Sequence, residues 1–113
     1  MESLKQKLRD FAEARDWEKF HSPKNLVMAM NVEAAELMEH FQWRTQEESR
    51  NLDRETREKV KQEIGDVLVY LVRLADQVGI DPVQAAEEKI FLNEVRYPED
   101  KVKGSAKKYN EYE

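Results

Sequence analysis

Two pairs of acidic residues are the strongest chemical signal in this sequence. Glu33 and Glu36 form one pair, Glu63 and Asp66 form the other, and each pair has i, i+3 spacing. That spacing places both carboxylates of a pair on one face of a helix. If two such helices pack face to face, four carboxylates meet, and clusters of oxygen ligands suit hard cations, above all Mg²⁺ or Mn²⁺. The four acids are therefore candidate metal ligands.

Acidic pairs also arise by chance in a chain with 24 Asp and Glu among 113 residues, and most of them are solvated helix faces. The apolar setting of these pairs favours a site instead. Glu33 interrupts an apolar stripe between Met30 and Leu37, and the second pair opens the most apolar run in the chain, residues 67–72. An acid in such a place usually has a partner.

The elements that must position these acids are predicted to be helices. With only 3 Gly and 3 Pro, the chain has little material for the tight turns of a sandwich or barrel. Capping residues, glycine and proline divide the chain into helices over about 3–20, 22–43, 54–78 and 82–97, with a polar loop over 44–53. Short connections favour antiparallel neighbours, so we expect an all-α, antiparallel four-helix bundle. Residues 1–98 would form this domain, and residues 99–113 a polar C-terminal arm.

The third predicted helix is too apolar to be covered by one small chain. Residues 67–72 are apolar nearly all round the helix, and such a helix must be covered on every side. Four short helices can hardly provide that cover, so we expect an oligomer.

Composition excludes several classes of protein. The formal net charge of −5 argues against a protein that coats nucleic acid. The absence of cysteine excludes a disulfide framework, a thiolate zinc site and a cysteine nucleophile, and it fits a cytoplasmic protein. No apolar stretch is long enough to span a bilayer, and no signal peptide is recognisable, so we expect no membrane partner.

Several segments together resemble a known family. The stretches EAAELMEHFQW (33–43) and EIGDVLVYLVRLAD (63–76) look like the ExxE…ExxD signature of the MazG-like all-α nucleotide pyrophosphohydrolases. RDWEKFHSPKNL (15–26) and the pattern Lys89…Asn93…Tyr97-Pro98 are most similar to the dCTP pyrophosphatase branch. The resemblance covers roughly residues 8–110. One departure is Gly65, inside the ExxD turn, where a helix former is expected.

The resemblance implies a reaction and an assembly. Such enzymes hydrolyse a nucleoside triphosphate to the monophosphate and pyrophosphate with Mg²⁺, for which Mn²⁺ is a possible substitute. By matched position, Glu33, Glu36, Glu63 and Asp66 would be metal ligands and catalytic residues, and either Glu33 or Glu36 could be the general base. The implied substrates are dCTP or a 5-modified dCTP, the role is nucleotide-pool house-cleaning, and the assembly is a homotetramer, a dimer of dimers.

The resemblance also implies residues that bind the substrate. Trp17 and Trp43 would stack on the base, His21 matches the family's FH…P stretch, and Tyr70 would lie near the deoxyribose. The candidates on the fourth helix and in the tail are Lys89, Asn93, Lys107 and Lys108. Arg96 is added by spacing alone, because i, i+4 and i+7 positions share one helix face.

Other functions compete with this interpretation. A di-iron carboxylate bundle needs two Glu-x-x-His motifs, and only Glu18 and His21 have that spacing. A non-catalytic helical interaction module would explain an oligomer, but it gives no reason for Glu33 on a core stripe. Within the superfamily, a dUTP-directed enzyme, a hydrolase with a broad substrate range and a phosphoribosyl-ATP pyrophosphohydrolase share the same acids.

Overall fold

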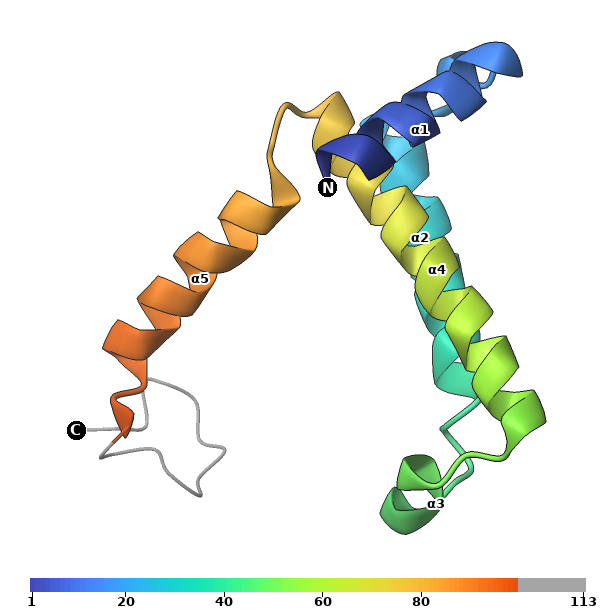
Figure 1. Ribbon diagram of the computed structural model, residues 1–113, viewed down its shortest axis with the longest axis vertical. Coiled ribbons are helices and arrows are strands. Elements are labelled where there is room, and N and C mark those ends of the chain that lie inside the picture. The colour runs from blue at the N-terminus through green and yellow to red at the C-terminus, as the bar shows by residue number, and fades with distance from the viewer. Residues whose placement is uncertain (100–113) are drawn as a thin grey trace. The chain divides into compact units, whose positions relative to one another are not determined.

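The computed structural model describes residues 1–99 of the chain, and its regular structure there is entirely helical (Figure 1). The all-α prediction is therefore confirmed. The elements are α1 (Glu2–Ala14), the 3₁₀ helix η1 (Glu18–Phe20), α2 (Pro23–Glu39), α3 (Gln46–Arg50), α4 (Arg54–Gln77) and α5 (Pro82–Arg96).

The three longest helices begin where local sequence signals place them. The Ser22 side chain accepts a hydrogen bond from the backbone N–H of Asn25 at 3.2 Å, with Pro23 in the first turn of α2. Asp53 caps α4 in the same way, and Asp81 accepts hydrogen bonds from two backbone N–H groups at the start of α5. Each cap satisfies donors that the first helical turn leaves free.

Helix ends and the polar loop differ from the prediction. The single helix expected over 3–20 is wrong, because Asp16 takes a left-handed φ of 53° and breaks it into α1 and η1. The second helix ends at Glu39 rather than near residue 43. The predicted loop 44–53 contains the short helix α3, which begins with a reciprocal capping box between Thr45 and Glu48.

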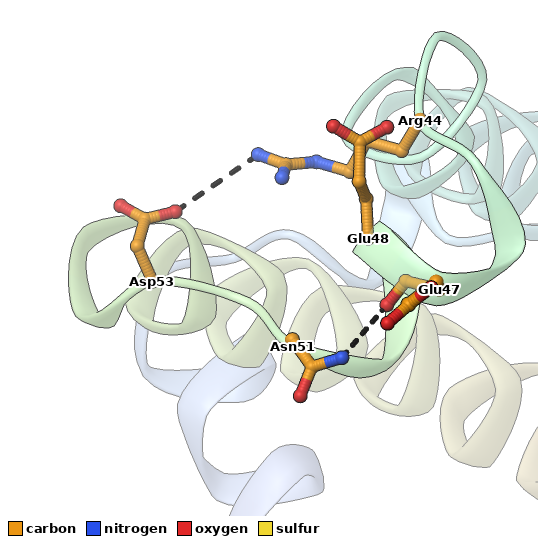
Figure 2. Close-up of a pocket in the computed structure, with 5 residues that line it drawn as sticks. All are labelled: Arg44, Glu47, Glu48, Asn51 and Asp53. Carbon is orange, nitrogen blue, oxygen red and sulfur yellow. Dashed lines mark hydrogen bonds and ion pairs between the residues drawn. The ribbon is translucent and has the colours of Figure 1, made fainter.

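A second set of contacts fixes the turn from α2 to α4. The Arg44 guanidinium donates to the backbone oxygen of His40 at 2.9 Å and to the Thr56 hydroxyl at 3.2 Å, and it lies 4.0 Å from Asp53. Figure 2 shows the ion pair of Arg44 and Asp53, two of the residues that line the surface pocket beside α3. These contacts hold the ends of two helices at a fixed separation.

The chain divides into two units, residues 1–80 and residues 81–113. In the first unit α2 and α4 pack along each other, and α1 packs on α4. The buried apolar side chains are few: Ala12, Leu26, Val60, Val72 and Ala75. The second unit contains α5, on which Ile90, Phe91 and Val95 are exposed.

An apolar stripe along α4 divides into a covered and an uncovered part. Val60 is buried, but Ile64, Leu71 and Val78 are 53 %, 39 % and 48 % exposed. These three lie at heptad spacing and so form one stripe along α4. Gly65 lies beside this stripe, and a Cβ there would meet nothing within 4 Å in the single chain.

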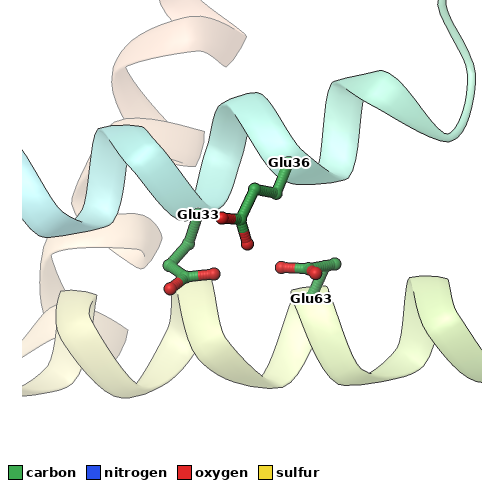
Figure 3. A group of neighbouring side chains, drawn as sticks. All are labelled: Glu33, Glu36 and Glu63. Carbon is green, nitrogen blue, oxygen red and sulfur yellow. The ribbon is translucent and has the colours of Figure 1, made fainter.

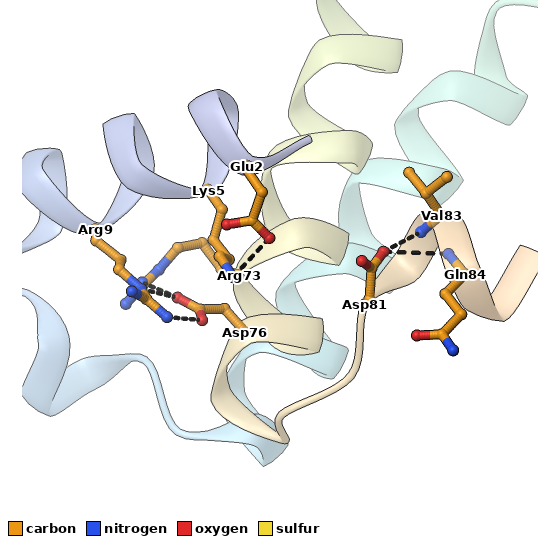
Figure 4. Close-up of polar contacts among 8 residues, drawn as sticks. All are labelled: Glu2, Lys5, Arg9, Arg73, Asp76, Asp81, Val83 and Gln84. Carbon is orange, nitrogen blue, oxygen red and sulfur yellow. Dashed lines mark hydrogen bonds and ion pairs between the residues drawn. The ribbon is translucent and has the colours of Figure 1, made fainter.

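An ion-pair clamp holds α1 on the end of α4. The Nε and Nη2 atoms of Arg9 donate to the two carboxylate oxygens of Asp76 at 2.6 and 2.5 Å (Figure 4). The guanidinium of Arg9 holds the pKa of Asp76 below its usual range. A bidentate pair of this kind is both strong and directional.

Over residues 1–99, no helix is long and apolar enough to cross a lipid bilayer.

Candidate functional site

Three of the four predicted metal ligands lie together across the α2–α4 interface. Carboxylate oxygens of Glu33 and Glu36 on α2 and of Glu63 on α4 all lie within 4.8 Å of one another. Figure 3 shows the three side chains converging in the space between the two helices. All three are half-buried.

Asp66 lies at the edge of this group. It is exposed on α4, one turn after Glu63, and its carboxylate is not among the three that converge. Its charge nevertheless acts on Glu33, where it disfavours ionisation. The fourth predicted ligand is therefore close enough to contribute to the electrostatics of the cluster.

Ionisation of this carboxylate cluster is unfavourable, and a bound cation would remove that free-energy cost. Burial, followed by the neighbouring carboxyls of Glu36 and Glu63, raises the pKa of Glu33 to about 7. One oxygen of Glu33 and one of Glu63 are buried without a hydrogen-bond partner. Orphaned carboxylate oxygens facing one another fit a hard divalent cation, because Mg²⁺ binds through carboxylates and waters. The donor set thus fits the metal that the sequence predicts.

A second feature of the first unit gathers three predicted substrate-binding residues. Trp17, His21 and Tyr70 line one small cavity of about 80 Å³. The Trp17 ring stands edge-on to Phe11, with centroids 5.6 Å apart, and edge-on to the His21 imidazole at 6.4 Å. Rings in this arrangement offer an aromatic wall to a planar ligand.

Sequence reasoning missed a cationic residue of this cavity. Arg73 on α4 lines it and is only 3 % exposed. Burial, and secondarily the charge of Arg73, lowers the pKa of His21. The imidazole is therefore neutral near pH 7, with its Nδ1 buried and without a hydrogen-bond partner. The signal for Arg73 was a single charge within the apolar run VLVYLVRLA.

The remaining predicted residues are carried by other segments of the chain. Trp43 follows α2, is 89 % exposed and is not among the residues that line the aromatic cavity. Lys89, Asn93 and Arg96 lie on α5, in the second unit, and Lys89 and Asn93 are exposed there. Lys107 and Lys108 lie outside the described residues.

Comparisons with known proteins identify the family of the chain. The chain matches the MazG-like family over residues 28–112. It is 39 % identical to human dCTP pyrophosphatase 1 and 40 % identical to the bovine protein of that name, in each case over 98 % of this chain. It spans 66 % of the length of the human protein and 67 % of the bovine one.

A solved structure has the same fold. The crystal structure of a pyrophosphatase from Archaeoglobus fulgidus superposes with a TM-score of 0.81 at 42 % sequence identity. The match covers 87 % of this chain and 92 % of the archaeal one. Family match, sequence identity and fold agree, and the chain belongs to the MazG-like family.

Proposed function

We propose that this protein hydrolyses a deoxynucleoside triphosphate to the monophosphate and pyrophosphate, with dCTP or a 5-modified dCTP as the leading substrate. The observation that carries the proposal is the convergence of Glu33, Glu36 and Glu63 with two orphaned carboxylate oxygens. The relatives named dCTP pyrophosphatase 1 support the choice of reaction and of base. The role would be to clean or balance the nucleotide pool of the cytoplasm.

In this proposal the carboxylates hold Mg²⁺. Glu33, Glu36 and Glu63 supply converging oxygens, and Asp66 adds a fourth carboxylate from the next turn of α4. Bound Mg²⁺ would neutralise triphosphate charge and lower the pKa of a bound water. Either Glu33 or Glu36 could take the proton of the attacking water.

The aromatic cavity takes the base in the same proposal. Trp17 offers a ring face for stacking, and Tyr70 stands on α4 one turn beyond Asp66, where it would border the sugar. An aromatic ring beside the sugar leaves little room for a 2′-hydroxyl, which favours deoxynucleotides. Lys89, Asn93, Arg96, Lys107 and Lys108 are proposed phosphate or sugar contacts, and Trp43 a second stacking ring.

The proposed assembly is a homotetramer. Over residues 1–99 the buried core of the single chain is small, and the stripe of Ile64, Leu71 and Val78 is uncovered. Burying apolar area is the main source of stability in such a chain, so a second copy is the natural cover. Light scattering during gel filtration should give the mass of four chains, and a monomer mass would contradict this part of the proposal.

Product analysis tests the reaction itself. The protein is incubated with each common dNTP and NTP and with 5-methyl-dCTP, in Mg²⁺ and in EDTA. We expect metal-dependent release of monophosphate and pyrophosphate, fastest with dCTP or its 5-methyl derivative. Release of orthophosphate would indicate a different hydrolase. No turnover with any substrate, even in Mn²⁺, would favour the non-catalytic interaction module.

Glu63→Gln and Asp66→Asn test the metal site. Each removes a carboxylate charge while keeping the size of the side chain, so kcat/KM should fall at least about 100-fold. The helical circular dichroism spectrum should stay that of the wild type. Glu58→Gln, an exposed acid on the same helix, is the matched control. Wild-type turnover in either variant would show that the metal ligands have been misassigned.

The pH dependence of stability tests the strained cluster without any substrate. Because folding raises the pKa of Glu33 from 4.5 to about 7, its contribution favours folding below about pH 4.5 and is lost as pH rises through about 7. We therefore compare the Tm of the wild type with that of Glu33→Gln in EDTA. The difference, wild type minus variant, should decrease by on the order of 5 °C as the pH rises from about 5 to about 8. His21 titrates in the same range with the opposite sign, but both proteins contain it, so its effect cancels.

Mg²⁺ should reverse this loss of stability. Ligands must be deprotonated to bind metal, so Mg²⁺ should raise the Tm of the wild type more at about pH 8 than at about pH 6. It should have much less effect on Glu33→Gln. Equal shifts of both proteins at both pH values would mean that Mg²⁺ binds elsewhere.

A further inference from the structure

Arg73 is a buried cation whose hydrogen-bonding capacity is largely unused. Its side chain is 3 % exposed, and its Nε and Nη2 atoms are buried without a hydrogen-bond partner. Leaving such donors unpaired is unfavourable, most of all on a charged group. A buried guanidinium in this state indicates that its partner is not among residues 1–99, so a bound ligand can supply the missing acceptors.

The nearby carboxylate cannot be that partner, because another arginine already holds it. Both oxygens of Asp76 accept hydrogen bonds from Arg9, at 2.6 and 2.5 Å (Figure 4). Arg73 approaches it only through Nη1, at 3.7 Å, which is beyond hydrogen-bond distance. Two guanidinium groups thus share one carboxylate, and the trio keeps a net positive charge.

The free donors belong to a side chain that lines the aromatic cavity. Arg73 lines it together with Trp17, His21 and Tyr70. The charge of Arg73 contributes to the lowered pKa of His21, so the guanidinium and the imidazole are close. A ligand here would meet aromatic walls and two coplanar N–H donors, a combination that suits a flat ring with hydrogen-bond acceptors on its edge.

The spacing along α4 places this cavity at the distance of a base from the carboxylate cluster. Asp66, Tyr70 and Arg73 have i, i+4 and i+7 spacing and share one face of the helix. Arg73 lies about 10 Å along the axis from Asp66. That is the scale on which the base of a nucleotide is separated from its triphosphate, so a phosphate held at the carboxylates leaves the base near Arg73.

We propose that Arg73 determines base specificity, with its Nε and Nη2 donating hydrogen bonds to the O2 and N3 atoms of a cytosine ring. This inference rests on the proposed function and identifies the group that would read the base. Cytosine presents two adjacent acceptors on that edge, whereas uracil and thymine carry an N–H at N3, which would face a donor. Guanine also has adjacent acceptors, O6 and N7, but its two fused rings suit a cavity of about 80 Å³ less well.

The test compares substrates that differ by one acceptor. Wild-type protein and Arg73→Met are assayed with dCTP, with 3-deaza-dCTP, in which C–H replaces N3, and with dUTP. The wild type should prefer dCTP to both analogues, and Arg73→Met should lose about 10-fold to 100-fold in kcat/KM with dCTP. The kcat/KM values of the variant for the three substrates should also be nearly equal. Arg57→Met, an exposed arginine on α4, is the matched control and should keep wild-type selectivity.

A binding measurement separates this inference from the proposed reaction. Quenching of tryptophan fluorescence by dCMP and by dUMP is followed in EDTA, where no turnover occurs. Tighter binding of dCMP to the wild type, lost in Arg73→Met, supports the role of Arg73 even if no dNTP is hydrolysed. Turnover of dNTPs without base discrimination in either assay overturns the role of Arg73 and leaves the proposed reaction standing.

Other outcomes also decide the matter. Equal use of dCTP and 3-deaza-dCTP by the wild type overturns the inference, as does a preference for dGTP. A selectivity for dCTP that survives in Arg73→Met does the same. If Arg73→Met loses its helical circular dichroism spectrum, Arg73→Lys takes its place, because it keeps the charge without the paired donors. Retained selectivity in that variant overturns the inference.

Discussion

The packing of α2 against α4 forces three carboxylates into one half-buried space, and the chemistry of the first unit depends on that constraint. Burial in that space, followed by the neighbouring carboxyls of Glu36 and Glu63, raises the pKa of Glu33 to about 7. The helices cannot move apart freely, because the caps at Ser22 and Asp53 and the contacts of Arg44 fix their starts and the turn between them. The packing of the two helices therefore makes ionisation of the cluster unfavourable, and a bound cation can offset that electrostatic free energy.

The same helix that carries Glu63 carries the opposite charge further along. Arg73 is buried two turns beyond Asp66, and Arg9 on α1 holds its nearest counter-ion, Asp76. The end of this α4 face that carries Glu63 and Asp66 therefore attracts cations. The end that carries Arg73 offers hydrogen-bond donors to an acceptor. Because a helix has a fixed rise per residue, the separation between the two is set by sequence spacing alone. A nucleotide with its metal has the matching polarity, with anionic phosphates at one end and base acceptors at the other.

Features that depend on neighbouring residues could be predicted from the sequence, and those that depend on distant pairs could not. The starts of α2, α4 and α5 follow from single capping residues two or three positions away. The i, i+3 spacing of the acids predicted a shared face, and the structure brings three of them together. By contrast, the left-handed turn at Asp16 has no strong local signal. The unused donors of Arg73 depend on a clamp between Arg9 and Asp76, which are 67 residues apart.

The small core links the stability of the chain to the geometry of its site. Within the described part of the chain, residues 1–99, only a few apolar side chains are buried, and α4 keeps an uncovered stripe of Ile64, Leu71 and Val78 beside the turn that carries Glu63 and Asp66. A helix is stiff, so whatever covers this stripe also fixes how far the carboxylates on α4 lie from those on α2. Repulsion within the cluster pushes the two helices apart, and apolar burial elsewhere on α4 must resist that push. Covering the apolar stripe and binding a cation therefore both act on the distance between α2 and α4. Each should make the other more favourable.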